Sequence, residues 1–271
     1  MGYLKRFSDL SGGIAAFFAA VFLMGKYMEY DPENVGEGKS KLEWFFSASN
    51  ASEYRQYLVL IGLIVLCVAL GVIFKKIPAV SLVVSLLPLC QAMSMLYRDL
   101  FYEFKHFYIA VCILMFCANL YETLATDKAN GKRSTEFAAH AIGVLGAILT
   151  VFSLYANKIA MQLNDPELYE HLFDKNSEIA SGLKPFGMVF YSGVPEKEAT
   201  TLILLATALV ACVLISMLLQ KVHFINALLA LVPFVWCMIA FHSENISTAP
   251  MLVIVPAAAY FACCLALVWR E

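Results

Sequence analysis

The sequence predicts an all-α integral membrane protein with about eight transmembrane helices, arranged as a 4+4 parallel internal repeat. Three observations support this fold class. Hydrophobic residues make up 61% of the 271-residue chain and charged residues only 15%, whereas apolar residues account for about half of an ordinary soluble domain. The apolar residues fall into runs of about 20, the length that an α-helix needs to cross about 30 Å of hydrocarbon. A pattern in the first half of the chain also returns in the second half.

Eight apolar runs are long enough to cross a bilayer. They are 10–25, 57–74, 77–97, 107–125, 137–156, 199–219, 222–241 and 251–269. Each run is continuous rather than alternating, and lipid does not tolerate unpaired backbone groups, so we predict helices rather than barrel strands. We expect residues 1–9 to be a basic lead-in to the first helix, because Lys5 and Arg6 precede the apolar run.

The strongest internal pattern is a hairpin of two apolar runs separated by Lys75 and Lys76. It recurs 145 positions later, and this shift aligns identical residues: Cys67 with Cys212, Lys76 with Lys221, Pro88 with Pro233 and Met93 with Met238. Four spans per half is an even number, so the two halves would share one orientation, as in transporters built from parallel repeats. We therefore predict a duplicated four-helix unit.

Basic residues near the ends of the runs predict the orientation. Short segments on the side of the N-terminus are rich in Lys and Arg, so we expect both termini in the cytoplasm, in a plasma or bacterial cytoplasmic membrane. The predicted organisation is a first repeat over 1–125 with an external loop over 26–56, a cytoplasmic linker over 126–136, and a second repeat over 137–271 with an external loop over 157–198. Both external loops carry an Asp-Pro-Glu sequence, at Asp31 and at Asp165, that is typical of a helix start.

Polar side chains inside the third and seventh runs are the candidate substrate-binding residues. The third run has Ser81, Gln91 and Ser94, and the 145-residue shift places Asn226 opposite Ser81 and Trp236 opposite Gln91. Pro88 and Pro233 would kink both helices. Two kinked helices related by a pseudo-two-fold axis would bring Gln91 and Trp236 together near mid-membrane, where such folds bind substrate. The alternative is that Gln91 and Asn226 only form hydrogen bonds to neighbouring helices.

A second candidate is an ion or proton site at Asn119 and Glu122 in the fourth run, with His140 as a partner from the fifth. Asn119 and Glu122 share a helix face, because they are three residues apart. Glu122 is the only carboxylate that we place inside a run, and ionisable groups in membranes are functional candidates by default. The alternative is an interfacial acid that reaches the headgroup layer and a histidine used only for packing.

Several classes of function have no support in the sequence. All eight cysteines lie in the predicted spans, without the spacing of a disulfide framework or a metal site. No zinc-protease, nucleophile-elbow, Walker or dinucleotide motif is present. We therefore expect no catalytic residues, no metal and no cofactor. The expected partners are membrane lipid and, through the external loops, another membrane or extracytoplasmic protein, but not nucleic acid.

Two functional hypotheses remain. The first is a carrier or permease for a small solute, with its site near mid-membrane between the third and seventh helices. The second is a non-catalytic membrane subunit or assembly factor of a larger complex, suggested by the scarcity of charge in the spans. A lipid-modifying enzyme would need a polar cavity near Asn119, Glu122 and His140 that opens to the bilayer.

Overall fold

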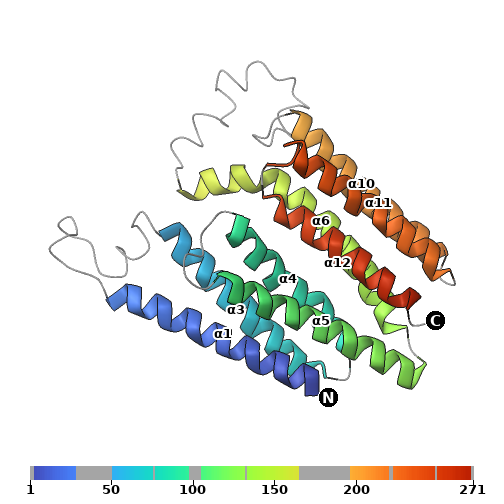
Figure 1. Ribbon diagram of the computed structural model, residues 1–271. Coiled ribbons are helices and arrows are strands. Elements are labelled where there is room, and N and C mark those ends of the chain that lie inside the picture. Colours follow the sequence, from blue (N-terminus) through green and yellow to red (C-terminus); the bar gives the residue numbers. More distant parts are fainter. Residues whose placement is uncertain are drawn as a thin grey trace. The chain divides into compact units, whose positions relative to one another are not determined.

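The computed structural model describes residues 3–28, 51–75, 77–97, 105–131, 133–164, 196–219, 222–247 and 249–269 (Figure 1). This described part contains eight α-helices and no strand. The helices are α1 (Tyr3–Met28), α3 (Ala51–Ile73), α4 (Pro78–Tyr97), α5 (Lys105–Asn130), α6 (Ser134–Asn164), α10 (Glu196–Leu218), α11 (His223–His242) and α12 (Met251–Val268). Each of them is long and apolar enough to cross a membrane. The chain is therefore a multi-pass membrane protein of the predicted fold class.

Several of the predicted boundaries differ from those of the structure. Helix α3 already begins at Ala51, and α6 continues to Asn164, inside the loops expected over 26–56 and 157–198. α1 begins at Tyr3, so the expected lead-in is helical and Lys5 in its first turn is buried. Asp9 follows Lys5 by four residues and neutralises its charge within the helix, which allows it to be buried. α5 continues to Asn130 and α6 starts at Ser134, so most of the expected linker over 126–136 is helical. The helix starts expected at Asp31 and Asp165 lie outside the described residues.

The turn between α5 and α6 is fixed by one glycine and one carboxylate. Gly131 has a φ of 63°, a backbone conformation that glycine adopts without steric strain. The buried carboxylate of Asp127, at the end of α5, accepts hydrogen bonds from the backbone N–H groups of Ser134 (2.9 Å) and Thr135 (2.7 Å) and from the Thr135 hydroxyl (2.8 Å). These groups belong to the start of α6, where the N–H groups lack partners within the helix and the helix dipole favours negative charge. Asp127 therefore caps α6 from the preceding helix.

The helices form two compact units. The first comprises Met1–Ala139 with Trp269–Glu271, and the second comprises His140–Val268. In the first unit α4 packs against α3 and α5, and α1 packs against the same two helices. Its buried core includes Tyr57, Leu60, Ile64, Met95, Tyr108 and Met115. In the second unit α11 packs against α10 and α12.

Small residues bring helices close together in both units. In α1 the buried residues Gly12, Ala15, Ala16 and Ala19 form a stripe, and a Cβ atom at Gly12 would lie 3.0 Å from the Met115 Sδ atom of α5. In α6 a Cβ atom at Gly143 would overlap Val213 of α10, and one at Gly146 would lie 2.9 Å from the Pro256 Cβ atom of α12. In membranes the hydrophobic effect does not drive helices together, because lipid tails are as apolar as the side chains. Helices therefore commonly associate through such close approach of their backbones.

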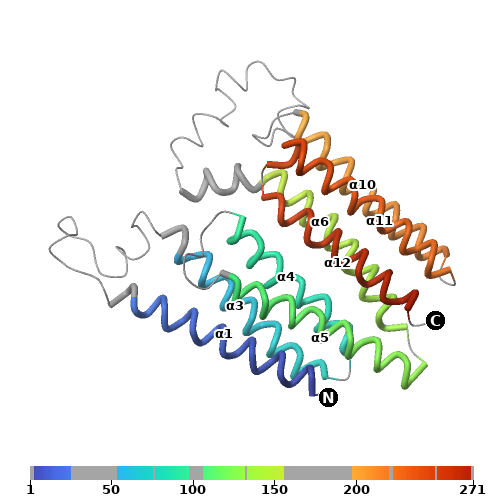
Figure 2. The backbone as a smooth tube through the Cα atoms, in the orientation of Figure 1, coloured from blue at the N-terminus to red at the C-terminus, as the bar shows by residue number. Residues whose placement is uncertain are grey.

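The α3–α4 hairpin has a counterpart later in the chain, the α10–α11 hairpin, and both can be followed in Figure 2. Both α10 and α11 begin and end 145 residues after α3 and α4. Their turn hydrogen bonds also correspond: the bond from Phe74 N to Leu70 O recurs from Leu219 N to Ile215 O, and the bond from Ile77 N to Phe74 O recurs from Val222 N to Leu219 O. The 145-residue shift seen in the sequence therefore also relates the helices and turns of the two hairpins. The duplication of a whole four-helix unit stays a prediction.

Candidate functional site

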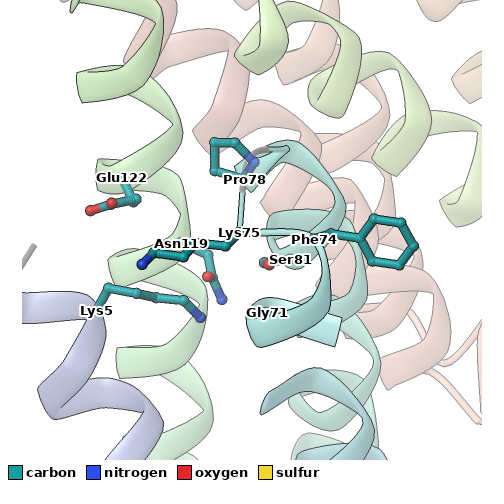
Figure 3. A pocket seen from close by; sticks show the side chains of 8 residues that line it. All are labelled: Lys5, Gly71, Phe74, Lys75, Pro78, Ser81, Asn119 and Glu122. Atoms are coloured by element: carbon teal, nitrogen blue, oxygen red, sulfur yellow. The ribbon is translucent and has the colours of Figure 1, made fainter. Parts of the chain in front are cut away.

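A polar pocket lies within the first unit, near the ends of its helices. It is lined by Lys5 of α1, Gly71 of α3, Phe74 and Lys75 of the following turn, Pro78 and Ser81 of α4, and Asn119 and Glu122 of α5 (Figure 3). Its cavity volume is about 20 Å³, enough for one or two water molecules. Lys5, Gly71 and Ser81 all lie within the first or last turn of a candidate span, so the pocket lies close to one membrane face rather than at the midplane.

Gly71 makes the pocket possible. A Cβ atom at this position would lie 3.2 Å from the Lys5 Nζ atom and 3.5 Å from the Ser81 Oγ atom. The missing side chain therefore leaves space into which an ammonium group and a hydroxyl group both reach. Lys5 and Ser81 come from different helices, and they meet because α1 and α4 both approach α3 at this point.

The charge of Lys5 is partly compensated inside the helix. Its Nζ atom donates a hydrogen bond of 2.7 Å to Asp9 Oδ1, and the two side chains are only 4% and 15% exposed. Removing two charges from water is costly, and their attraction repays this only when the geometry is good and the remaining donors find partners. A lysine ammonium group has three donors. Lys5 thus keeps donor capacity that a group in the pocket can use.

The wall formed by α5 is polar and locally ordered. Asn119 is buried, and its Nδ2 atom donates to the backbone oxygen of Met115 (2.8 Å). The Thr123 hydroxyl donates to the backbone oxygen of Asn119 (2.7 Å). These bonds fix Asn119 at the pocket wall. Glu122 is half-buried one turn further along the same face, as its spacing predicts.

The structure brings together candidates from both predicted groups. Ser81, a candidate substrate-binding residue, lines the same pocket as Asn119 and Glu122, the candidate ion or proton site. His140 belongs to the second unit. Two lining residues, Lys5 and Lys75, were missed, because the sequence places one in a lead-in and the other in a turn. The four-residue spacing of Lys5 and Asp9 was a signal that the first helix begins earlier.

The other candidates of the third run lie elsewhere in the first unit. The Gln91 side-chain amide donates to Gln56 of α3, both to the side-chain oxygen and to the backbone oxygen (3.3 Å). The interaction of Gln91 is therefore the helix-to-helix hydrogen bond that the alternative interpretation expected. The Oγ atom of Ser94 is buried and has no hydrogen-bond partner within the described part of the chain.

The candidates of the seventh run belong to the second unit. Asn226 is buried and its Nδ2 atom donates to the backbone oxygen of Leu219 in the preceding turn (3.3 Å). Trp236 is half-buried in α11. Because Gln91 and Trp236 belong to different units, a site shared between them stays a prediction.

Comparisons with known proteins add no functional assignment. The described residues contain no group of three or more His, Cys, Asp or Glu side chains placed to hold a metal ion. No protein-family model matches the chain, and neither a curated protein nor a solved structure matches it.

Proposed function

We propose that the protein is a membrane carrier for a small polar solute and that the pocket of the first unit is its solute site. The observation that carries this proposal is the placement of Lys5, Asp9 and Glu122 inside candidate membrane spans, with Lys5 and Glu122 lining one pocket. Ionisable side chains in spans are costly and rare, and they typically mark solute or ion pathways.

The geometry supports binding at an entrance rather than in a preformed central cavity. A cavity of about 20 Å³ admits water, so a larger solute requires the pocket to widen. The wall contributed by α1 can do this, because Lys5 lies in the first turn of α1, where the helix begins. Carriers expose such a site to one side of the membrane at a time.

The test is solute counterflow with purified protein in proteoliposomes. The radiolabelled panel is phosphate, acetate, methylamine, glycine and glycerol, which covers anionic, cationic, zwitterionic and neutral chemistry. We expect Ser81→Ala to reduce counterflow of the accepted solute by about tenfold, the effect of losing one good polar contact, and Gly71→Ser, which fills the space, to abolish it. The matched control is Thr207→Ala on α10, whose exposed hydroxyl bonds only to its own helix at Ile203 O. Equal counterflow in all variants, or none for any panel member, contradicts the proposal.

The same assay examines the mid-membrane site of Gln91, Ser94, Asn226 and Trp236. If that site binds the solute, Trp236→Ala lowers counterflow while the protein remains folded and Ser81→Ala has little effect. The opposite pattern supports the pocket of the first unit. Since Gln91 is bonded to Gln56, Gln91→Ala is not a clean probe of binding.

A second candidate function is a non-catalytic membrane subunit or assembly factor. It is favoured by the internal pairing of polar side chains in the spans: Gln91 bonds to Gln56, and the Ser216 and Tyr260 hydroxyls lie 3.1 Å apart. Purification from the native membrane in a mild detergent, followed by mass spectrometry, tests it. A companion protein in fixed ratio supports the subunit, and a chain that elutes alone with counterflow activity supports the carrier.

A further inference from the structure

Positive charge enters the pocket of the first unit from two directions. The side chains of Lys5 and Lys75 extend into the gap in front of Ser81 and Asn119, one from α1 and the other from the α3–α4 turn (Figure 3). Lys5 is 3% exposed, so its ammonium group is largely removed from water. Charges in such surroundings interact more strongly than they do in solvent.

The start of α4 adds to this positive potential. Pro78 and Ser81 line the pocket and belong to the first turn of the 20-residue helix α4. Pro78, the first residue of α4, has no N–H, and the Val80 N–H donates to the Ile77 backbone oxygen (3.1 Å), so the contribution of this end is the helix dipole, which places about half a positive charge there. Anions, phosphate in particular, bind at such ends. The pocket thus joins two ammonium groups, a hydroxyl group and a helix N-terminus.

The second unit provides an internal comparison. With the 145-residue spacing, Gly71 corresponds to Ser216 and Ser81 corresponds to Asn226. The Ser216 hydroxyl lies 3.1 Å from the Tyr260 hydroxyl, and the Asn226 Nδ2 atom donates to the Leu219 backbone oxygen, while the Asn226 Oδ1 atom is buried without a partner among the described residues. Asn119 corresponds to Cys264, which has no comparable polar group. Gly71 and Asn119 of the pocket therefore have different residues at the corresponding positions of the second unit.

Two carboxylates oppose an anion: Asp9, which bonds to the Lys5 ammonium group, and Glu122, which lines the pocket. In Figure 3 the Glu122 carboxylate points away from Ser81 and the Lys5 side chain extends towards the gap, whereas the Lys75 side chain crosses in front of Asn119 and its ammonium group ends on the side of Glu122. The convergent groups nearest to Gly71 are therefore an ammonium group and a hydroxyl group. A carboxylate at the edge of the site would weaken anion binding without preventing it, and it would be essential for a cation. The effect of Glu122 thus distinguishes the two kinds of ligand.

We infer that this pocket, which must widen from its volume of about 20 Å³, binds a phosphate group held by Lys5, Lys75 and Ser81 beside the positive end of the α4 helix dipole. The inference rests on the proposed function, because it names the solute class of the same pocket. A phosphate group reaches a membrane protein from a soluble phosphate compound or from an anionic lipid headgroup, and basic pockets between membrane helices are known to bind such headgroups. The chemistry is the same in both cases, so the experiment has an arm for each source.

The first arm uses the full-length protein in a neutral detergent. Thermal unfolding is followed while inorganic phosphate is titrated at an ionic strength held constant with sodium chloride. A ligand that binds the folded state raises Tm in a saturable way, which yields an apparent Kd. We expect Lys75→Gln and Ser81→Ala to weaken phosphate binding by about tenfold each, and Gly71→Ser, which fills the space, to abolish it.

Two further variants make this arm specific. Glu122→Gln removes one opposing charge and should tighten phosphate binding severalfold. Lys128→Gln removes an exposed lysine from the last turn of α5, outside the pocket, and should leave the Kd unchanged. Lys75 is exposed on a turn, so its substitution should not impair folding. Loss of binding in Glu122→Gln, or equal effects of Lys75→Gln and Lys128→Gln, overturns the inference.

The second arm repeats the unfolding measurement in nanodiscs of phosphatidylcholine with and without phosphatidic acid. Three results together would show that the site binds a lipid headgroup: phosphatidic acid raises Tm, Lys75→Gln abolishes this rise, and inorganic phosphate has no effect. The inference then holds, and the pocket is not the carrier's solute site. If inorganic phosphate acts, both proposals are supported. If neither ligand acts, the inference fails, whereas counterflow of glycine or glycerol that depends on Ser81 would still support the carrier.

Discussion

At the scale of single residues, two buried charges of the first unit, those of Lys5 and Asp127, are balanced locally. The Lys5 ammonium group bonds to Asp9 one turn away, and the Asp127 carboxylate bonds to three donors at the start of α6. An ion buried in surroundings of low dielectric is tolerated when partners replace its lost hydration. Asp127 is fully satisfied in this way. Within the described part of the chain Lys5 bonds to Asp9 and also lines the pocket, which is why we propose a functional role for Lys5 and a structural one for Asp127.

Asp127→Ala should destabilise the protein by about 1–2 kcal/mol, as expected for the loss of a helix cap. The carboxylate is buried and accepts bonds from Ser134 and Thr135, and alanine leaves those donors unsatisfied. Thermal unfolding in detergent measures the effect. Lys128→Ala changes the next residue, which is exposed, and should alter stability by no more than about 0.5 kcal/mol. A Tm for Asp127→Ala equal to that of Lys128→Ala would disprove the cap.

Gln91 and Gln56 should be coupled in stability. Their side chains bond to each other across α4 and α3, and hydrogen bonds between membrane helices contribute about 0.5–2 kcal/mol. We expect Gln91→Ala and Gln56→Ala each to lower Tm, and the double variant to lower it by less than the sum. A double-mutant cycle of unfolding free energies measures this coupling. Additive effects would mean that the bond between the two side chains contributes nothing to stability. Gln91 would then again be a candidate for ligand binding.

The residue scale also shows what the sequence could reveal of the site. Ser81, Asn119 and Glu122 were recognisable because polar residues inside apolar runs are conspicuous. Lys5 and Lys75 were not, because lysines at the ends of spans are common and carry orientation information of their own. Their role depends on α1 packing beside the α3–α4 turn at Gly71, and this is a tertiary contact that no local pattern encodes.

At the scale of elements, the described helices are held together by small residues and face outwards with large apolar ones. The Gly12 and Gly143 positions approach neighbouring helices so closely that a methyl group would meet another side chain. Large residues such as Val72, Phe224 and Ile239 are exposed, as suits lipid contact. Span existence follows from length and hydropathy, and all eight predicted runs correspond to helices. The ends of helices do not follow from length and hydropathy, because α1 includes a charged first turn that precedes the apolar run.

Gly143→Ala should destabilise the second unit. The added methyl group would overlap Val213 and lie 3.3 Å from the Tyr260 ring, and forcing extra volume into packed interiors costs about 1–3 kcal/mol. The control is Gly62→Ala on α3, where no atom lies within 4 Å of the new methyl group. Alanine favours helix over glycine by about 0.5–1 kcal/mol, so the control should be neutral or stabilising. Thermal unfolding compares the two, and a destabilised control with a neutral Gly143→Ala would refute close packing of α6.

At the scale of the whole molecule, the hairpin spacing and the charge distribution lead to one topology. Helices α3 and α4 recur 145 residues later as α10 and α11, and their turns share hydrogen bonds. Two copies of a hairpin in one orientation require an even number of crossings from one copy to the next. The described helices between α4 and α10 are α5 and α6, which would provide two crossings. The positive-inside rule then predicts that the C-terminal end of α5 and the turns after Ile73 and Leu218 lie in the cytoplasm.

A matched pair of cysteine variants tests this topology. Lys128 in the last turn of α5 and Lys197 in the first turn of α10 are both exposed lysines, and one crossing by α6 separates them. In intact cells a membrane-impermeant maleimide should label Lys197→Cys and not Lys128→Cys, and in inverted vesicles the pattern should be reversed. The native cysteines give a low background, because seven are buried and Cys117 lies within a span. Labelling of Lys128→Cys alone in intact cells would show that the orientation is the reverse of the predicted one. Labelling of both variants from one side would show that α6 does not cross the membrane, and the parallel arrangement of the two hairpins would then be rejected.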